Sequence, residues 1–95
     1  MPNRRVPRPF QLLWGNGKII EEAAIEGGLH APALQLLAYE EGEKKGQLAL
    51  RFAAYDREGE LERRPLIINE REIPALRAQL DQSPRMKALL KKLVE

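Results

Sequence analysis

The chain has 95 residues, of which 43% are hydrophobic and 32% charged, and its formal net charge is +2. This length predicts one domain with a modest core, and no apolar run approaches the roughly 20 residues of a membrane-spanning helix. With no cysteine, one histidine and one serine, the chain lacks the usual residues of nucleophilic catalysis and of zinc sites. We therefore expect a cytoplasmic, non-enzymatic protein that uses no cofactor, binds no metal ion and does not associate with a membrane.

Charge is distributed unevenly along the chain. Residues 1–20 hold four basic and no acidic residues, whereas residues 21–43 hold six acidic and no basic ones. Residues 63–95 hold eight basic and four acidic residues. Such segregation indicates a face or an end that attracts anions, although a solvated surface with salt bridges explains it equally well.

The N-terminal third predicts a basic arm followed by a β-hairpin. Residues 1–9 carry three prolines and three arginines, which is typical of a disordered or extended segment, so residues 10–95 are expected to form the folded domain. After the apolar run 10–14, Gly15, Asn16 and Gly17 tolerate positive φ and predict a tight reversal. Residues 18–25 read as the second strand, although their glutamates and alanines also suit a helix. A loop is expected over residues 29–32.

Two longer strands are expected over residues 34–40 and 47–56, joined by a charged turn over residues 41–46. Because side chains alternate across a strand, one face of these strands collects leucine, phenylalanine and alanine. We predict that this face is the core of the protein. Its members are Leu34, Leu36, Ala38, Leu48, Leu50, Phe52 and Ala54.

The opposite face of the same two strands mixes aromatic, basic and small side chains. Arg51 and Tyr55 lie on the longer strand, and Gln35, Leu37 and Tyr39 lie on its neighbour. This mixture suits a binding platform, and it equally suits a face that another sheet or a second subunit covers. Whether the face is open or covered therefore distinguishes a nucleic-acid-binding protein from a protein-interaction module.

The C-terminal third predicts a final strand and helices. Residues 61–68 read as a strand that Pro65 places at an edge or a bulge, because proline cannot donate a ladder hydrogen bond. Asn69 and Glu72 have the spacing of a capping box, and Ser83 with Pro84 predicts the start of a further helix. That helix carries an apolar stripe at helical spacing, more typical of a core or a dimer interface than of a membrane helix. The stripe consists of Met86, Leu89, Leu90, Leu93 and Val94.

These elements predict an α+β fold. An antiparallel β-sheet of about four to five strands is followed by one or two C-terminal helices. We expect the chain to form a dimer, because a chain of this size buries little surface by itself.

The order of these elements resembles the single-stranded-DNA-binding domain of the positive-cofactor-four type transcriptional coactivators, within the broader Whirly-like group of folds. The similarity covers about residues 34–80 and is carried by LALRFAAYDREGELERR at 48–64 and PLIINEREIPAL at 65–76. The family pattern is a strand with an internal arginine that ends in aromatics, then a charged turn, a basic stretch, an apolar strand and an acidic helix start. Two positions depart from it. Arg63, Arg64 and Pro65 replace a lysine-rich stretch closed by glycine, and Ile73 with Pro74 replaces an aromatic early in the helix.

The resemblance implies a homodimer built through the C-terminal helices, with single-stranded DNA or RNA lying across the sheets. It assigns nucleic-acid contacts to Arg51, Tyr55, Arg63 and Arg64. Tyr39, Lys44 and Lys45 complete the expected site, because single-strand binding needs cations for phosphates and flat side chains for bases. The alternative function is a protein-interaction or dimeric scaffold module, in which the acidic residues 21–43 and the helical stripe meet a protein partner.

Overall fold

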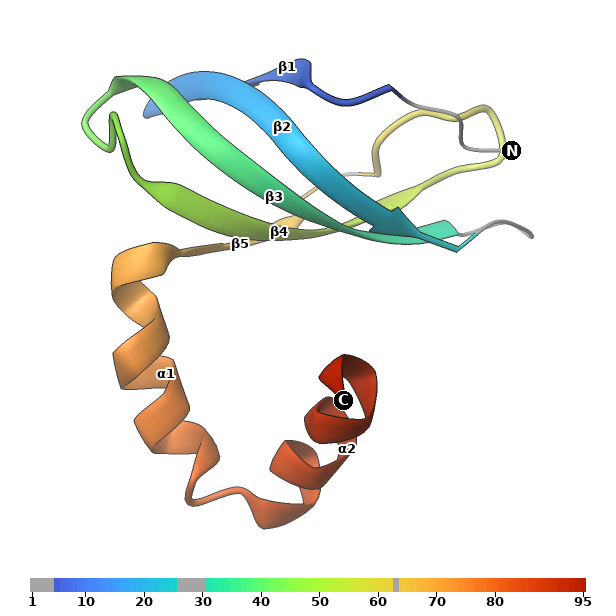
Figure 1. Cartoon of the computed structure of the whole chain (residues 1–95). Helices are drawn as coiled ribbons and strands as arrows, with labels where there is room; N and C mark the ends of the chain where they lie inside the picture. Colours follow the sequence, from blue (N-terminus) through green and yellow to red (C-terminus); the bar gives the residue numbers. More distant parts are fainter. Residues whose placement is uncertain (1–4, 26–30, 63) are drawn as a thin grey trace.

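The computed structural model describes residues 5–25, 31–62 and 64–95. Five β-strands form one antiparallel sheet in the order in which they follow along the chain, β1-β2-β3-β4-β5, and the helices come after them (Figure 1). The predicted α+β architecture is thereby confirmed. The strands are β1 (Arg8–Leu12), β2 (Gly15–Ala24), β3 (Ala31–Gly42), β4 (Leu48–Tyr55) and β5 (Leu66–Asn69), and the helices are the 3-10 turn η1 (Glu70–Glu72), α1 (Ile73–Leu80) and α2 (Pro84–Val94).

The first hairpin differs from its prediction in where it begins and turns. β1 starts at Arg8, within the expected basic arm, because the Arg8 guanidinium is held by hydrogen bonds from inside the sheet. The chain reverses at residues 13–14, so Gly15, Asn16 and Gly17 lie in β2 rather than in the turn. A Cβ at Gly17 would overlap the carbonyl oxygen of Ala38. Glycine is therefore needed here for the close approach of β2 to β3. Residues 1–4 lie outside the described residues.

The boundaries of β3 and β5 also differ from their predictions. β3 begins at Ala31, so Pro32, which was expected in a loop, lies in the strand opposite Ala54. The rest of that predicted loop, Leu29 and His30, lies outside the described residues. β5 is shorter than the predicted strand 61–68, because it starts directly after Pro65 and pairs with β4 from Leu66 onward. Its place at the end of the sheet confirms that Pro65 marks an edge strand.

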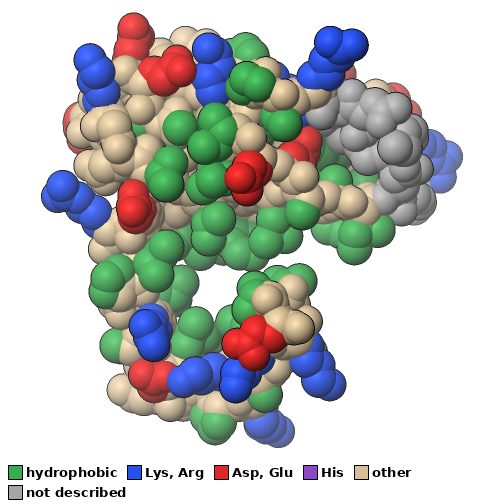
Figure 2. All heavy atoms as spheres, viewed as in Figure 1, with side chains coloured by type: hydrophobic (Ala, Val, Ile, Leu, Met, Phe, Trp, Pro, Cys, Tyr) green, Lys and Arg blue, Asp and Glu red, His purple; other side chains and the backbone are tan. Residues whose placement is uncertain are grey.

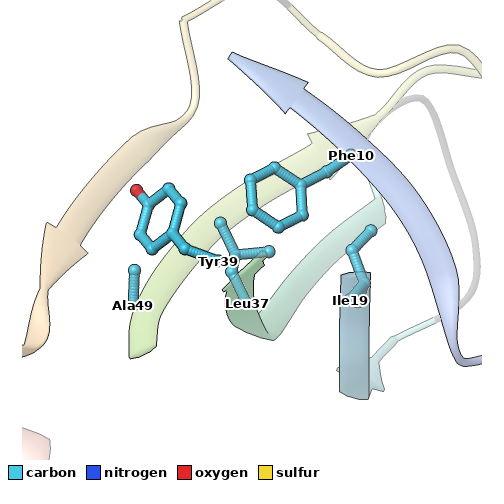
Figure 3. Close-up of a cluster of buried hydrophobic side chains, with 5 residues drawn as sticks. All are labelled: Phe10, Ile19, Leu37, Tyr39 and Ala49. Atoms are coloured by element: carbon cyan, nitrogen blue, oxygen red, sulfur yellow. The ribbon is translucent and has the colours of Figure 1, made fainter. Parts of the chain in front are cut away.

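The core lies inside the sheet, which curls so that β1 comes over the inner face of β3 and β4. The Phe10 ring on β1 meets the Tyr39 ring on β3 edge to face, with ring centroids 5.5 Å apart (Figure 3). Ile19, Leu37 and Ala49 complete this cluster, and each is at most 2% exposed. An inner surface built from alternate residues of each strand thus becomes the hydrophobic core.

This arrangement corrects the prediction of which face is the core. The buried residues of β3 and β4 are those of the mixed face, and they include Gln35, Leu37, Tyr39, Arg51 and Tyr55. The face that was predicted to be the core points outward, where Leu34, Leu36, Leu50 and Phe52 are half-buried and Leu48 is exposed. The predicted alternation of side chains between two faces is correct. That alternation does not indicate toward which face the sheet curls.

The helices extend from the sheet on the side of this outer face (Figure 1). Glu72 accepts a hydrogen bond from the backbone N–H of Asn69 at 2.8 Å, as the predicted capping box requires. Pro74 and Pro84 each lie in the first turn of their helix. No side chain of η1, α1 or α2 is buried. Among the described residues, no helix is long and apolar enough to cross a membrane.

The inner core predicts a contrast between two leucine substitutions. Leu37 is fully buried, whereas Leu13 in the first turn is fully exposed. Leu37→Ala should lower the free energy of unfolding by about 2–5 kcal/mol, because it leaves a cavity as well as removing apolar contact. Leu13→Ala should change it by less than about 0.5 kcal/mol. Urea unfolding followed by circular dichroism measures both values, and equal effects would contradict the assignment of the core.

Candidate functional site

The structure separates the predicted site residues into two groups. Arg51, Tyr55 and Tyr39 are buried in the inner face, with exposed fractions of 5%, 7% and 3%. Lys45 and Arg64 are exposed, and Lys44 is half-buried. Arg63 lies outside the described residues. The predicted residues therefore do not form one continuous surface.

A hydrogen-bonded network surrounds Arg51 and Tyr55. Arg51 Nε donates to Gln35 Oε1 at 2.6 Å, and Gln35 Nε2 donates to the Tyr55 hydroxyl at 2.8 Å and to Glu22 Oε2 at 2.7 Å. Arg8 donates to both carboxylate oxygens of Glu22, at 2.9 and 3.1 Å, and to the Tyr55 hydroxyl at 3.2 Å. Side chains from four strands, β1 to β4, are thus joined in one polar cluster inside the sheet.

The charges in this network have different environments. Burial lowers the pKa of the Arg51 guanidinium, because the charged form loses its hydration. The hydrogen bond to Glu22 raises the pKa of Arg8. Arg51 makes no ion pair among the described residues, but it hydrogen-bonds to the neutral amide of Gln35 and also interacts with the Tyr55 side chain. The network holds two guanidinium groups and one carboxylate, and the Gln35 amide links the second guanidinium to that carboxylate.

Tyr39 belongs to a separate chain of hydrogen bonds that crosses the sheet. The Trp14 indole N–H donates to the Tyr39 hydroxyl at 3.0 Å, and that hydroxyl donates to Asn69 Oδ1 at 2.8 Å. Asn69 is also the residue whose backbone N–H bonds to Glu72. The first hairpin is therefore connected through Tyr39 to the point where the helices begin.

These contacts show that the inner face is covered. Arg51 and Tyr39 bond to neighbouring side chains, and the Tyr55 hydroxyl accepts from two donors. A buried guanidinium or ring cannot neutralise a phosphate or stack on a base without opening the core. The face is covered, but by the curl of its own sheet and not by the other sheet or second subunit of the covered interpretation.

The outer face carries a groove that was not identified from the sequence. A hollow of about 230 Å³ lies along Leu34, Leu36 and Leu50, with Glu21 at its edge. A second hollow of about 190 Å³ continues from Leu36 and Leu50 to Glu70 and Ile73. We call these two adjoining hollows the outer groove. The sequence pattern that reveals it is the leucine face, which was interpreted as core.

The apolar stripe of α2 is the second uncovered surface. Met86, Leu89, Leu93 and Val94 are between 56% and 74% exposed. A shallow hollow of about 440 Å³ lies along Met86, Leu89, Leu90 and Leu93. Figure 2 shows hydrophobic side chains on the underside of the sheet and on the helices, with an open gap between the two. The protein therefore presents two separate apolar surfaces, one on the sheet and one on α2.

Outside the two hydrogen-bonded groups, described charged side chains pair at the surface. Within the described ranges, no group of three or more histidine, cysteine, aspartate or glutamate side chains is arranged to hold a metal ion. Lys18 pairs with Glu40 at 3.7 Å and Lys87 pairs with Asp81, both at the surface.

The network around Arg51 predicts a coupling between two substitutions. Gln35→Leu should lower the free energy of unfolding by about 1.5–3 kcal/mol, because it leaves a buried charged donor without its acceptor. Arg51→Met in the same chain should recover most of this loss, because it removes the buried charge and keeps a side chain of similar length. Urea unfolding of the wild type, both single variants and the double variant gives the coupling energy. Simple additivity would show that the Gln35–Arg51 hydrogen bond is not a stabilising unit.

Comparison with known proteins gave no family assignment. No protein-family model matches the chain. No curated protein matches it either, and no solved structure does. The resemblance to the coactivator domain thus rests on the residues quoted for it, and function is inferred below from the geometry of the chain.

Proposed function

We propose that the protein is a non-enzymatic homodimeric scaffold, a module that works by associating with a second copy of itself and presenting the assembled surface to a partner. The observation that carries this proposal is the complete lack of buried side chains in α1 and α2. These helices have 8 and 11 residues. Isolated helices of this length are marginal in water, and most helical stability in proteins comes from packing an apolar face.

Two further observations support self-association. The leucines of the outer groove are only half-buried, and Met86, Leu89, Leu93 and Val94 of the α2 stripe are exposed. Contiguous exposed apolar patches on soluble proteins often mark interaction sites. Both surfaces belong to the same chain, so two copies related by a two-fold axis cover both surfaces on each copy. A single dimer interface would thereby bury both the outer groove and the α2 stripe.

Dimerisation predicts a strong effect of charge placed on the α2 stripe. Leu89→Glu combined with Leu93→Glu should raise the dimer dissociation constant about a hundredfold or more, because burying each leucine contributes roughly 1.5–3 kcal/mol. Sedimentation equilibrium over a range of protein concentrations measures this constant. Helical circular dichroism at 222 nm should fall in the same variant, because the helices lose the surface that stabilises them.

The matched control places the same charge at an exposed leucine outside both surfaces. Leu13→Glu should leave the dissociation constant unchanged, since Leu13 is fully exposed. A wild-type chain that sediments as a monomer at every concentration tested would rule out the proposed scaffold.

A second candidate function is the binding of single-stranded nucleic acid by the same dimer. It is favoured by the surface cations of the predicted site, because the half-buried Lys44 and the exposed Lys45 and Arg64 make no ion pair with any residue that the structure describes. The helices add positive charge, since residues 73–94 hold five basic residues and one acidic one. On this hypothesis, phosphates would bind at surface cations, and the buried Arg51, Tyr39 and Tyr55 would support the fold.

This candidate predicts salt-sensitive binding that depends on the β3–β4 turn. Lys44→Glu with Lys45→Glu should weaken binding of a mixed-sequence single-stranded oligonucleotide. It should also reduce the slope of log K against log salt by about 1.4, the value for two lost phosphate contacts. Fluorescence anisotropy at several salt concentrations measures both effects.

Glu41→Gln with Glu43→Gln, in and beside the same turn, is the charge control and should strengthen binding. If neither pair of substitutions changes the affinity, the turn is not part of a nucleic-acid site. If the wild type does not bind at low salt, the protein is not a nucleic-acid-binding protein of this kind.

A further inference from the structure

We infer that the outer groove is the seat of α2 from a second copy of the chain, so that the two copies exchange their C-terminal helices. This inference rests on the proposed dimer and goes beyond it. A dimer can also form through helices alone, leaving both grooves open. The occupant follows from the length, the polarity and the charge of the groove.

The length of α2 matches the length of the groove. The two adjoining hollows run from Glu21 on β2, across β3 and β4, to Glu70 and Ile73 at the start of the helices. Three steps between neighbouring strands span about 14 Å. A helix of 11 residues spans about 16 Å. One α2 helix therefore crosses the groove from end to end.

The two surfaces are also alike in polarity. The floor of the groove is formed by Leu34, Leu36 and Leu50, and the α2 stripe offers Leu89 and Leu93. Packing the stripe on the floor removes leucine side chains on both sides from water. Each side otherwise stays partly exposed, which is unfavourable at roughly 25 cal/mol for each Å² of apolar surface.

Charge complementarity favours α2 as the helix that fits the groove. α2 carries four basic residues and no acidic one. At helical spacing, Arg85 and Lys92 flank one side of the apolar stripe and Lys87 and Lys91 flank the other. Glu21 and Glu70 lie at opposite ends of the groove. The groove, which is acidic at both ends, therefore suits a helix with basic residues beside its apolar stripe. Such charge pairs contribute more to specificity and register than to affinity.

The helix of the same chain leaves the groove open. The groove is lined by residues of β2, β3 and β4 together with Glu70 and Ile73, whereas Leu89 and Leu93 of the α2 stripe are exposed. α1 leads the chain away from the sheet before α2 turns back (Figure 1). Because each copy offers one groove and one free stripe, a reciprocal exchange fills both grooves with two equivalent contacts.

Disulfide trapping tests this exchange directly, because the chain contains no cysteine of its own. Full-length Leu50→Cys and Leu89→Cys chains are mixed, refolded together and oxidised, and linked peptides are identified by mass spectrometry. A disulfide between positions 50 and 89 in this mixture can join only two different copies. We expect it to form in high yield, because the seated helix brings these positions within the roughly 7 Å between Cα atoms that a disulfide requires.

Two controls make the result decisive. Glu58→Cys, on the exposed turn after β4, is mixed with Leu89→Cys and should give little product. Leu36→Cys replaces Leu50→Cys on the groove floor if that variant folds poorly, and it should link to position 89 equally well. Sedimentation equilibrium of each mixture reports the dimer independently.

The outcomes separate the exchange from the dimer itself. Dimeric chains that link positions 50 and 89 no better than positions 58 and 89 would overturn the exchange and leave the scaffold proposal standing. Monomeric chains would overturn both. A chain carrying both Leu50→Cys and Leu89→Cys that links within one copy would show that α2 folds back onto its own sheet, which also overturns the exchange.

Discussion

The curl of the sheet determines most of what this protein can do. Arg8 at the start of β1 reaches Tyr55 at the end of β4, and Trp14 reaches Tyr39 from the first turn. Through these contacts, strands that are not neighbours in the sheet line the same interior. Once the sheet is curled in this sense, one face of every strand becomes the core and the other becomes surface. The surface that faces the helices then includes the leucines, which inverts the core assignment predicted from the sequence.

This inversion is sustained by hydrogen bonding, since a buried arginine is costly unless its donors are satisfied. Gln35 is the residue that makes Arg51 tolerable, because its amide oxygen accepts from the guanidinium while its nitrogen donates onward. The leucine face, in contrast, is only half-buried by the part of the chain that the structure describes. An interior that accommodates polar groups and an exterior that exposes apolar ones are consistent with a chain whose folding is completed by association.

The sequence predicted the elements well, but it did not predict the side to which they curl. The order of strands and helices, the capping box at Asn69 and the edge position of Pro65 depend on local chemistry, and these predictions hold. Residues that alternate along a strand were also assigned to the correct two faces. The choice between those faces depends on contacts across the sheet, such as Arg8 with Tyr55, that no local pattern contains.

The candidate site was correspondingly harder to predict than the fold. Arg51 and Tyr55 were predicted to contact nucleic acid, because a cation and an aromatic ring on one face can bind phosphates and bases. The same two side chains can equally belong to a buried hydrogen-bonded network, as they do here. The outer groove could be recognised only after its leucines were known to face outward. Composition does not distinguish a leucine that packs inside a chain from one that packs between chains.

The inner network and the outer groove are two consequences of the same strands. Leu36 lies between Gln35 and Leu37, and Leu50 lies between Ala49 and Arg51, so each residue that fills the interior places a groove residue on the other side. The far wall of the groove is positioned in the same way, because Tyr39 holds Asn69, and Asn69 begins the turn that carries Glu70. Glu70 is in turn fixed to the sheet by the backbone N–H of Leu48. A substitution inside the sheet should therefore alter the shape of the outer groove, even though it touches no residue of that groove.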